Sequence, residues 1–276
     1  MSGAEEESCA SGGGIKVKVD DDEKAAELRD ELLFKQTESS HYGDCPICCL
    51  PLSLVPQKSL MYPCCSKFIC RGCKYANRMR EKEGRLQHQC PFCRHPTVKS
   101  MEEAEINHMR RVKANDPVAL SAMGGHYYGN KQQYKKAFEY YTKAAALGNM
   151  DAHYSLAFLY ARGDGVEKDE KKRVYHFEEA AIGGHADARY YLGNFEVENE
   201  RYDRAIKHWI IAANMGHDKS LGMLKENYAN GYVAKDDFAS ALRAHHAAVV
   251  ATKSPERELA EVVKQKAETA KVTRQK

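Results

Sequence analysis

The segment at residues 205–217 reads AIKHWIIAANMGH, and three other segments of the chain align with it without gaps. They are AFEYYTKAAALGN (137–149), RVYHFEEAAIGGH (173–185) and ALRAHHAAVVATK (241–253), and successive starts lie 36, 32 and 36 residues apart. A recurrence of this period is typical of helical repeats, in which each unit buries its apolar face against the next unit. The second half of the chain is therefore predicted to form an all-α array.

The copy at 205–217 carries its apolar residues on one side of a helix. Counted from Tyr202, three residues before the copy begins, six positions are spaced at i, i+3, i+4, i+7, i+10 and i+11, which places them on a single face. They are Tyr202, Ala205, Ile206, Trp209, Ala212 and Ala213. A partner segment precedes each copy, such as ARYYLG at 188–193, so each unit is predicted to be a helix, a turn and a second helix.

Each unit combines small alanines with one large side chain. The alanines let paired helices approach closely, and the large side chain is predicted to fill the space between units. These large residues are Tyr141, Phe177 and Trp209, whereas His245 takes the same place in the fourth copy. We interpret His245 as an adaptation of the last repeat and not as a ligand.

The turn GDGVEKD at 163–169 is the most characteristic piece of these units. With it, the units resemble Sel1-like repeats, which are relatives of tetratricopeptide repeats, over about residues 116–252. The resemblance implies four helix pairs in a right-handed superhelical solenoid that binds other proteins. No repeat contains a nucleophile beside an evident base, or a phosphate-binding loop, so the repeats favour binding over chemistry.

Nine of the ten cysteines lie in one short stretch, in the segments CPICCLPL (45–52), YPCCSKFICRGC (62–73) and CPFCR (90–94). Zinc binds four ligands at tetrahedral corners, and a Cys-x-x-Cys turn delivers two thiolates to one ion. Three such pairs and one adjacent pair would complete two closed sites with two zinc ions. Because the intervening loops are too small for a core, the metal is expected to supply about 10 kcal/mol of folding free energy per site. The eight candidate ligands are Cys45, Cys48, Cys64, Cys65, Cys70, Cys73, Cys90 and Cys93.

The first 40 residues indicate the cellular compartment in which the cysteines would bind metal. Residues 1–40 carry 11 acidic and 5 basic side chains, and the first residues are acidic where a secretory signal would be basic and apolar. No apolar run is long enough to cross a bilayer. We expect an intracellular protein, cytoplasmic or nuclear, with a disordered acidic tail over 1–40 in which Cys9 is unligated. In a reducing compartment, clustered cysteines favour metal thiolates over disulfides.

The cysteine layout resembles a RING finger over residues 44–95, and we expect a small zinc-braced α+β module over 41–99. In that family the ligands interleave. By resemblance one zinc is held by Cys45, Cys48, Cys70 and Cys73, and the other by Cys64, Cys65, Cys90 and Cys93.

This sequence departs from the commonest RING pattern at Lys67, where a histidine is usual and where an ammonium group has no lone pair to offer. Cys64 is the best substitute, and His88 is the first alternative if Cys64 is free. Cys49 is a spare cysteine that could replace Cys48 if the turn shifts. His41, His88 and His95 are otherwise expected at the surface or as partners of the ligands.

RING fingers occur mostly in ubiquitin ligases, and the resemblance implies that role here. Such a module binds a ubiquitin-conjugating enzyme and orients its thioester without forming a covalent intermediate. Ile47 and Pro91 match the apolar contacts to that enzyme, and Arg94 matches the arginine that bridges it to ubiquitin. The guanidinium suits this role because its planar fork donates to two partners at once. The alternative is a non-catalytic zinc-binding adaptor, with a protein partner on the repeats in either case.

A nucleic-acid reading of the basic segment 73–90 is not favoured. Aromatic stacking residues are nearly absent from it, and glutamates interrupt its basic run. A solvated helix between the third and fourth cysteine pairs explains the pattern better.

Two further helices are predicted outside the cysteine module and the repeats. Residues 100–115 begin with Ser100 and Glu103 in the spacing of a capping box, and an apolar stripe follows that could pack on the first repeat. Residues 253–276 begin with Ser254 as cap and Pro255 at the first helical position. We expect this C-terminal helix to close the last repeat and then to fray. The apolar stripe of the first of these helices, which connects the cysteine module to the repeats, consists of Ile106, Met109 and Val112.

Overall fold

The computed structural model describes residues 14–129 and 133–274. The chain divides into two compact units, Met1–Lys35 and Gln36–Lys276. In the first unit, α1 (Gly14–Phe34) is a helix, where the sequence predicted a disordered tail over 1–40. Its run of Ala, Glu and Leu residues has high helix propensity, which the low hydrophobicity of the segment concealed. Among the described residues, none of the helices combines the length and apolar composition that crossing a membrane requires.

The cysteine-rich part of the second unit is a small α+β module. Two short strands, β1 (Ser59–Tyr62) and β2 (Lys67–Cys70), pair antiparallel, and α2 (Arg71–Glu83) follows directly. A single turn of 3-10 helix, η1 (Pro56–Lys58), precedes β1. The core of the cysteine module is made of Leu52, Ile69 and the buried cysteines themselves, so few apolar side chains hold the module together.

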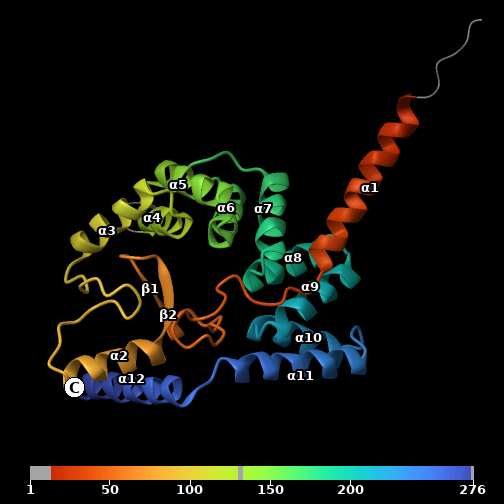
Figure 1. Cartoon of the computed structure of the whole chain (residues 1–276). Coiled ribbons are helices and arrows are strands. Elements are labelled where there is room, and N and C mark those ends of the chain that lie inside the picture. The colour runs from red at the N-terminus through yellow and green to blue at the C-terminus, as the bar shows by residue number, and fades with distance from the viewer. Residues whose placement is uncertain (1–13, 130–132, 275–276) are drawn as a thin grey trace, which may run out of the picture. The chain divides into compact units, whose positions relative to one another are not determined.

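The repeats form an all-α stack of consecutive helix pairs (Figure 1). Residues 130–132, in the predicted turn of the first unit, lie outside the described part of the chain. Helices α4 and α5, α6 and α7, and α8 and α9 pack as pairs, and α10 and α11 follow as a further pair. Their bounds are α4 (Pro117–Gly129), α5 (Tyr134–Ala146), α6 (Met150–Arg162), α7 (Glu170–Ile182), α8 (Ala186–Glu198), α9 (Tyr202–Asn214), α10 (Asp218–Ala229) and α11 (Lys235–Ala251).

The predicted large residues fill the repeat core, where Tyr141, Phe177 and Trp209 are 7%, 2% and 1% exposed. Two of these large side chains pack directly against a glycine of the partner helix. A side chain at Gly124 of α4 would lie 2.7 Å from the Tyr141 ring, and one at Gly193 of α8 would overlap the Trp209 indole. This close approach holds paired helices together by shape as well as by apolar area.

The connector helix α3 (Met101–Lys113) begins at the predicted cap, because the Ser100 side chain accepts a hydrogen bond from the backbone N–H of Glu103. Its stripe behaves only partly as predicted. Val112 packs on the core of the first repeat, but Ile106 is 60% exposed and Asn107 is buried in its place. The stripe was therefore predicted with a rotation error of about one residue.

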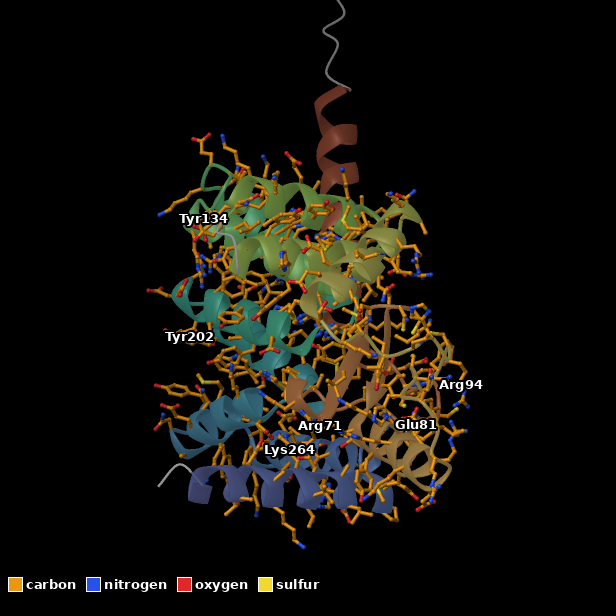
Figure 2. The ribbon with its side chains drawn as sticks, turned by 90° about the vertical axis from the view of Figure 1, so that its left-hand side faces the viewer. Arg71, Glu81, Arg94, Tyr134, Tyr202 and Lys264 are labelled. Carbon is orange, nitrogen blue, oxygen red and sulfur yellow. The ribbon has the colours of Figure 1, made fainter. Side chains whose placement is uncertain are left out.

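The C-terminal helix α12 (Pro255–Arg274) also starts as predicted, since the backbone N–H of Arg257 donates to Ser254 Oγ. Its position differs from the prediction. Instead of closing the last repeat, α12 packs along α2 of the cysteine module (Figure 1). Figure 2 shows Arg71 of α2 and Lys264 of α12 close together, and both line one cleft between these helices. The cysteine module and the C-terminal helix are thus in contact.

Candidate metal centre and partner surfaces

The structure brings eight cysteines into two groups of four. The first group contains Cys45, Cys48, Cys70 and Cys73, and the second contains Cys64, Cys65, Cys90 and Cys93. Within each group all four sulfur atoms lie within 4.8 Å of one another. The groups interleave along the chain, because β1 and β2 carry the third pair back to the first pair while the last loop returns to Cys64 and Cys65.

The sulfur separations fit a metal better than a disulfide. Cys48 Sγ lies 3.9 Å from Cys70 Sγ, and Cys65 Sγ lies 3.8 Å from Cys90 Sγ. Zinc–sulfur bonds of about 2.3 Å in a tetrahedron place the sulfur atoms about 3.8 Å apart. A disulfide needs about 2.05 Å, and all nine described cysteines are free. The donor set therefore fits two tetrahedral thiolate sites.

The electrostatics of the groups also call for a cation. Burial raises the pKa of Cys65 to about 11 and that of Cys73 to about 12, because a thiolate loses hydration there. A hydrogen bond from the Cys70 thiol lowers the pKa of Cys45 to about 4. Four adjacent sulfurs cannot all ionise without a compensating charge. A divalent ion would supply that charge.

The remaining candidates from the sequence lie outside the two groups. Cys49 is exposed next to Cys48, and Lys67 is exposed on β2. His88, the first alternative ligand, is 61% exposed at its side chain and pairs with Glu81 at 2.8 Å. His95 contributes its backbone carbonyl to the N–H of Cys90. Cys9 lies outside the described residues.

The three residues predicted to contact a conjugating enzyme differ in exposure. Ile47 is 41% exposed, whereas Pro91 is buried and its neighbour Phe92 is 44% exposed. Arg94 is exposed in a left-handed backbone conformation, with φ of 62°, and its side chain lies at the edge of the module (Figure 2). Its Nη1 lies 3.5 Å from Asn77 Oδ1.

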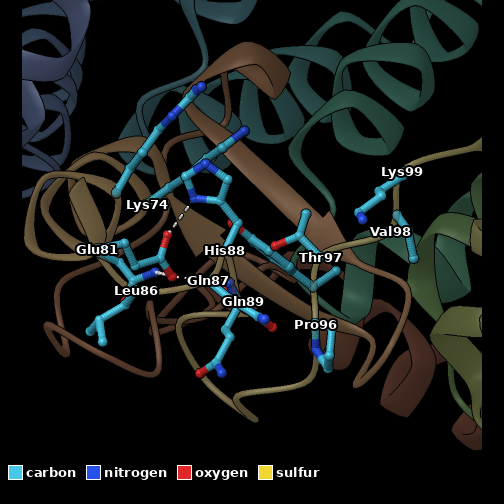
Figure 3. Close-up of a pocket in the computed structure, with 13 residues that line it drawn as sticks. Lys74, Glu81, Leu86, Gln87, His88, Gln89, Pro96, Thr97, Val98 and Lys99 are labelled. Carbon is cyan, nitrogen blue, oxygen red and sulfur yellow. Dashed lines mark hydrogen bonds and ion pairs between the residues drawn. The ribbon is translucent and has the colours of Figure 1, made fainter. Parts of the chain in front are cut away.

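A buried carboxylate beside the last cysteine loop was missed by sequence reasoning. Glu81 is 3% exposed and accepts hydrogen bonds from the Gln89 backbone N–H and from Asn77 Nδ2. Burial alone would raise its pKa, but His88, Gln89 and Asn77 together lower it. Glu81 lies beside His88 and Gln89 (Figure 3), in a cleft of about 600 Å³ between α2 and residues 86–99. The charge pattern of 81–88 does not predict this, because glutamates within a basic helix are typical of a solvated surface.

His41 occupies a second unpredicted cluster, where the cysteine module meets the repeats. Its Nε2 lies 3.2 Å from Asp151 Oδ1, and its ring stacks on His185 at 4.1 Å. His185 Nδ1 accepts the backbone N–H of Ala188, so the ring proton is on Nε2, 3.5 Å from the same Asp151 oxygen. A protonated Nε2 cannot ligate a metal. The tautomer therefore favours a hydrogen-bonded cluster here over a metal site.

The repeats carry an aromatic cleft of about 300 Å³. Helices α4, α5, α6 and α8 contribute to it, so one cleft crosses three units. Arg162 sits at its edge, donates to Tyr128 Oη at 2.8 Å and lies over the Phe158 ring. The other lining residues include Tyr154, Ser155 and Tyr191. Such a surface can bury an apolar or aromatic side chain of a protein partner and offer polar groups to its backbone.

Comparison with known proteins identifies the repeats. The family model of the Sel1 repeat matches residues 117–149, 151–185 and 186–217. These units correspond to α4–α5, α6–α7 and α8–α9, so the predicted Sel1 repeats are confirmed there. The pair α10–α11 lies beyond the matched residues. An all-helical solenoid of Sel1 repeats is therefore the architecture of this region.

The similar proteins share only part of the chain. A 38-residue stretch is 55% identical to the cytochrome c oxidase assembly factor 7 homolog of Drosophila melanogaster and covers 14% of each chain. Another of 86 residues is 30% identical to chitin synthase regulatory factor 4 of Schizosaccharomyces pombe, covering 31% of this chain and 14% of that protein. The matched stretch thus spans 14% of the length of either relative.

Two solved structures are also similar. The Sel1 repeat protein from Oxalobacter formigenes is 26% identical, with a TM-score of 0.48 over 56% of this chain and 66% of that one. The protein c5321, a protective antigen present in uropathogenic Escherichia coli strains, is 23% identical, with a TM-score of 0.43 over 62% of this chain and 37% of its own.

Proposed function

We propose that this chain is a RING-type ubiquitin ligase, or the RING component of one, in which the cysteine module recruits a ubiquitin-conjugating enzyme and the Sel1 repeats hold a protein substrate. The interleaving of the two four-cysteine groups carries the proposal. The first and third pairs share one group and the second and fourth share the other, as the RING resemblance of the sequence implies. A scaffold of Sel1 repeats beside such a module supplies a second protein-binding surface.

Each group would hold one zinc ion through its four thiolates. A site closed by four protein ligands has no open position for substrate or water, so the metal supplies folding free energy and shape. The chemistry belongs to the conjugating enzyme and its thioester. This module would act by holding that thioester in a reactive arrangement, which is positional and electrostatic catalysis.

Arg94 is the residue assigned to that step. Its exposed guanidinium follows directly on the last cysteine, and Asn77 Oδ1 lies within 3.5 Å of it. The fork can donate to the conjugating enzyme and to ubiquitin together, which fixes their relative orientation. Ile47, 41% exposed in the first loop, would supply apolar contact to the enzyme.

The alternative is a non-catalytic zinc-binding adaptor with the same two surfaces. The burial of Pro91 favours it, because a buried proline cannot serve as the expected apolar contact. Lys67, in place of the usual histidine, favours it as well. Phe92 offers exposed apolar surface beside Pro91 and would have to take over the contact in an active ligase.

Autoubiquitination with purified activating enzyme and a panel of conjugating enzymes separates the two functions. We expect Arg94→Ala to lower the rate at least about tenfold, because it removes a positioned charge, while the chain keeps two zinc ions. Arg85→Ala is the matched control, since Arg85 is exposed in the same module with a similar φ of 51°. A parent protein that holds two zinc ions but is inactive with every enzyme supports the adaptor. An Arg94→Ala protein as active as the parent contradicts the mechanism.

A further inference from the structure

Arg257 connects the C-terminal helix to the first cysteine group, although it lies 209 residues from Cys48 in sequence. Its Nη2 lies 3.3 Å from Cys48 Sγ and donates to the Leu50 carbonyl at 3.0 Å. Its Nη1 donates to the Pro51 carbonyl at 2.6 Å and to the Thr252 carbonyl at 2.7 Å. One guanidinium thus holds the sulfur and the two carbonyls of a single loop, and also the residue that ends the last repeat helix.

The cysteine module is shaped to receive this arginine. Gly72 lies between Cys70 and Cys73, and a side chain there would be 2.8 Å from both the backbone nitrogen and the Cγ of Arg257. Only a residue without Cβ allows α12 to approach the Cys-x-x-Cys turn so closely. On the other side, the Ser254 cap fixes the first turn of α12 and therefore the position of Arg257. Both ends of the contact are thus defined by local structure.

The chemistry of a zinc–thiolate site gives this contact a role. Four thiolates and one Zn²⁺ carry a net charge of about −2, which nearby N–H donors and cations stabilise. A guanidinium stays charged at every physiological pH and donates in a fixed fork, so it can serve the sulfur and the carbonyls together. An ammonium group at the same place would be a point charge without that geometry.

We infer that Arg257 is a positioning residue of the first cysteine site, which it stabilises by donating to the Cys48 sulfur and by fixing the loop 48–51. The inference rests on the zinc binding that the proposed function assumes. It also makes α12 a part of the metal module and not of the repeats. The second group serves as an internal reference, because the guanidinium's hydrogen bonds go to the first loop and to Thr252.

The test uses the full chain loaded with zinc and exposed to excess chelator. Alkylation of each cysteine is followed by mass spectrometry over time, so that the two sites are read separately in one molecule. In Arg257→Gln we expect cysteines of the first group to be alkylated about tenfold faster, the usual effect of losing such a partner, and those of the second group at the parent rate. Arg257→Lys should fall between the two, because it keeps the charge but not the fork.

A spectroscopic measurement separates hydrogen bonding from packing. In the chain loaded with Co²⁺, loss of an N–H donor makes the thiolate a better electron donor, so the thiolate-to-cobalt band should move to longer wavelength in Arg257→Gln. Arg243→Gln, at an exposed arginine of α11, is the control and should change neither measurement.

The outcomes distinguish this inference from the proposed function. A parent chain that binds no zinc defeats the metal centre itself. If the parent holds two zinc ions but Arg257→Gln leaves the first group unchanged, or accelerates both groups equally, the inference is wrong. Faster alkylation without a shifted cobalt band would also overturn it, because packing alone would then explain the effect.

Discussion

Gly193 of α8 lies directly against the indole of Trp209 of α9, in space that any larger residue would fill. Trp209 is 1% exposed, and it packs with Leu224 and Ala241 of the following helices. The glycine therefore sets the distance between the helices of one unit, while the tryptophan links that unit to the next. Gly124 and Tyr141 have the same relationship in the first unit.

Gly193→Ala should destabilise the repeats. The added Cβ overlaps the indole, and overpacking of this kind costs about 1–3 kcal/mol of unfolding free energy. Urea unfolding followed by circular dichroism measures the change. Gly222→Ala in α10 is the matched control, since no atom lies within 4 Å of the added group; there alanine should stabilise the helix by about 0.5–1 kcal/mol. Equal effects of both substitutions would show that the indole contact is unimportant.

The repeat core could be predicted because its signal is periodic. Tyr141, Phe177 and Trp209 recur at one position of an aligned unit, and the helix-face spacing identifies them before any contact is known. The two sets of four cysteines could also be predicted from the sequence, because Cys-x-x-Cys spacing is local and the RING resemblance implies the pairing. Their arrangement in the structure matches those sets, while zinc itself stays a prediction.

Apart from the local contacts of Glu81, the contacts that sequence reasoning missed join residues far apart in the chain. Arg257 reaches Cys48, and His41 reaches Asp151 and His185. A single arginine or histidine carries no periodicity, and its partner depends on how two modules meet. For Pro91, in contrast, the local motif is present but the exposure that it predicts differs from the structure. Its motif predicts a surface contact, but burial is decided by neighbouring loops that the motif does not describe.

Replacing one member of a cysteine group should cost metal, whereas replacing the spare cysteine should not. We expect about two zinc ions per chain in the parent, given four thiolates per structural site. Cys70→Ser should lose at least one ion, because Cys70 belongs to the first group and is buried. Cys49→Ser should keep both, since Cys49 is exposed and outside either group. Elemental analysis of the purified variants measures the zinc content per chain. A loss of zinc in Cys49→Ser would show that Cys49 is a ligand and would contradict the proposed ligand set.

Glu81→Ala should destabilise the cysteine module more than it affects the repeats. The substitution leaves the Gln89 N–H without its acceptor and removes one of the two acceptors of Asn77 Nδ2, and an unsatisfied buried donor costs about 1–3 kcal/mol. Hydrogen exchange of residues 86–96, compared with that of α8, would locate the effect. Glu83→Ala is the control, because Glu83 is an exposed residue at the end of the same helix. Uniform loss of protection across both regions would contradict a local role.

Acid should weaken the repeats through His185. Burial lowers the pKa of His185, whose unfolded value is near 6.5, so below about pH 6.5 the unfolded state binds a proton that the folded state resists. Stability contributed by the neutral ring is thus present above that pH and lost as pH falls. The pKa of Asp151 is also lowered: burial alone would raise it, but His185 and His41 outweigh that effect, so its contribution is lost only in stronger acid.

His185→Asn isolates this contribution, because Asn149 caps the helix of the preceding unit in the same way and the N-cap hydrogen bond is retained. Urea midpoints at pH 7.5 and 5.5 should differ less in His185→Asn than in the parent. His246→Asn, at an exposed position of α11, should keep the parental difference. Any acid sensitivity of the zinc sites is common to all three proteins and cancels in the comparison. If His185→Asn keeps the full pH dependence, the cluster with Asp151 does not control the acid response of the repeats.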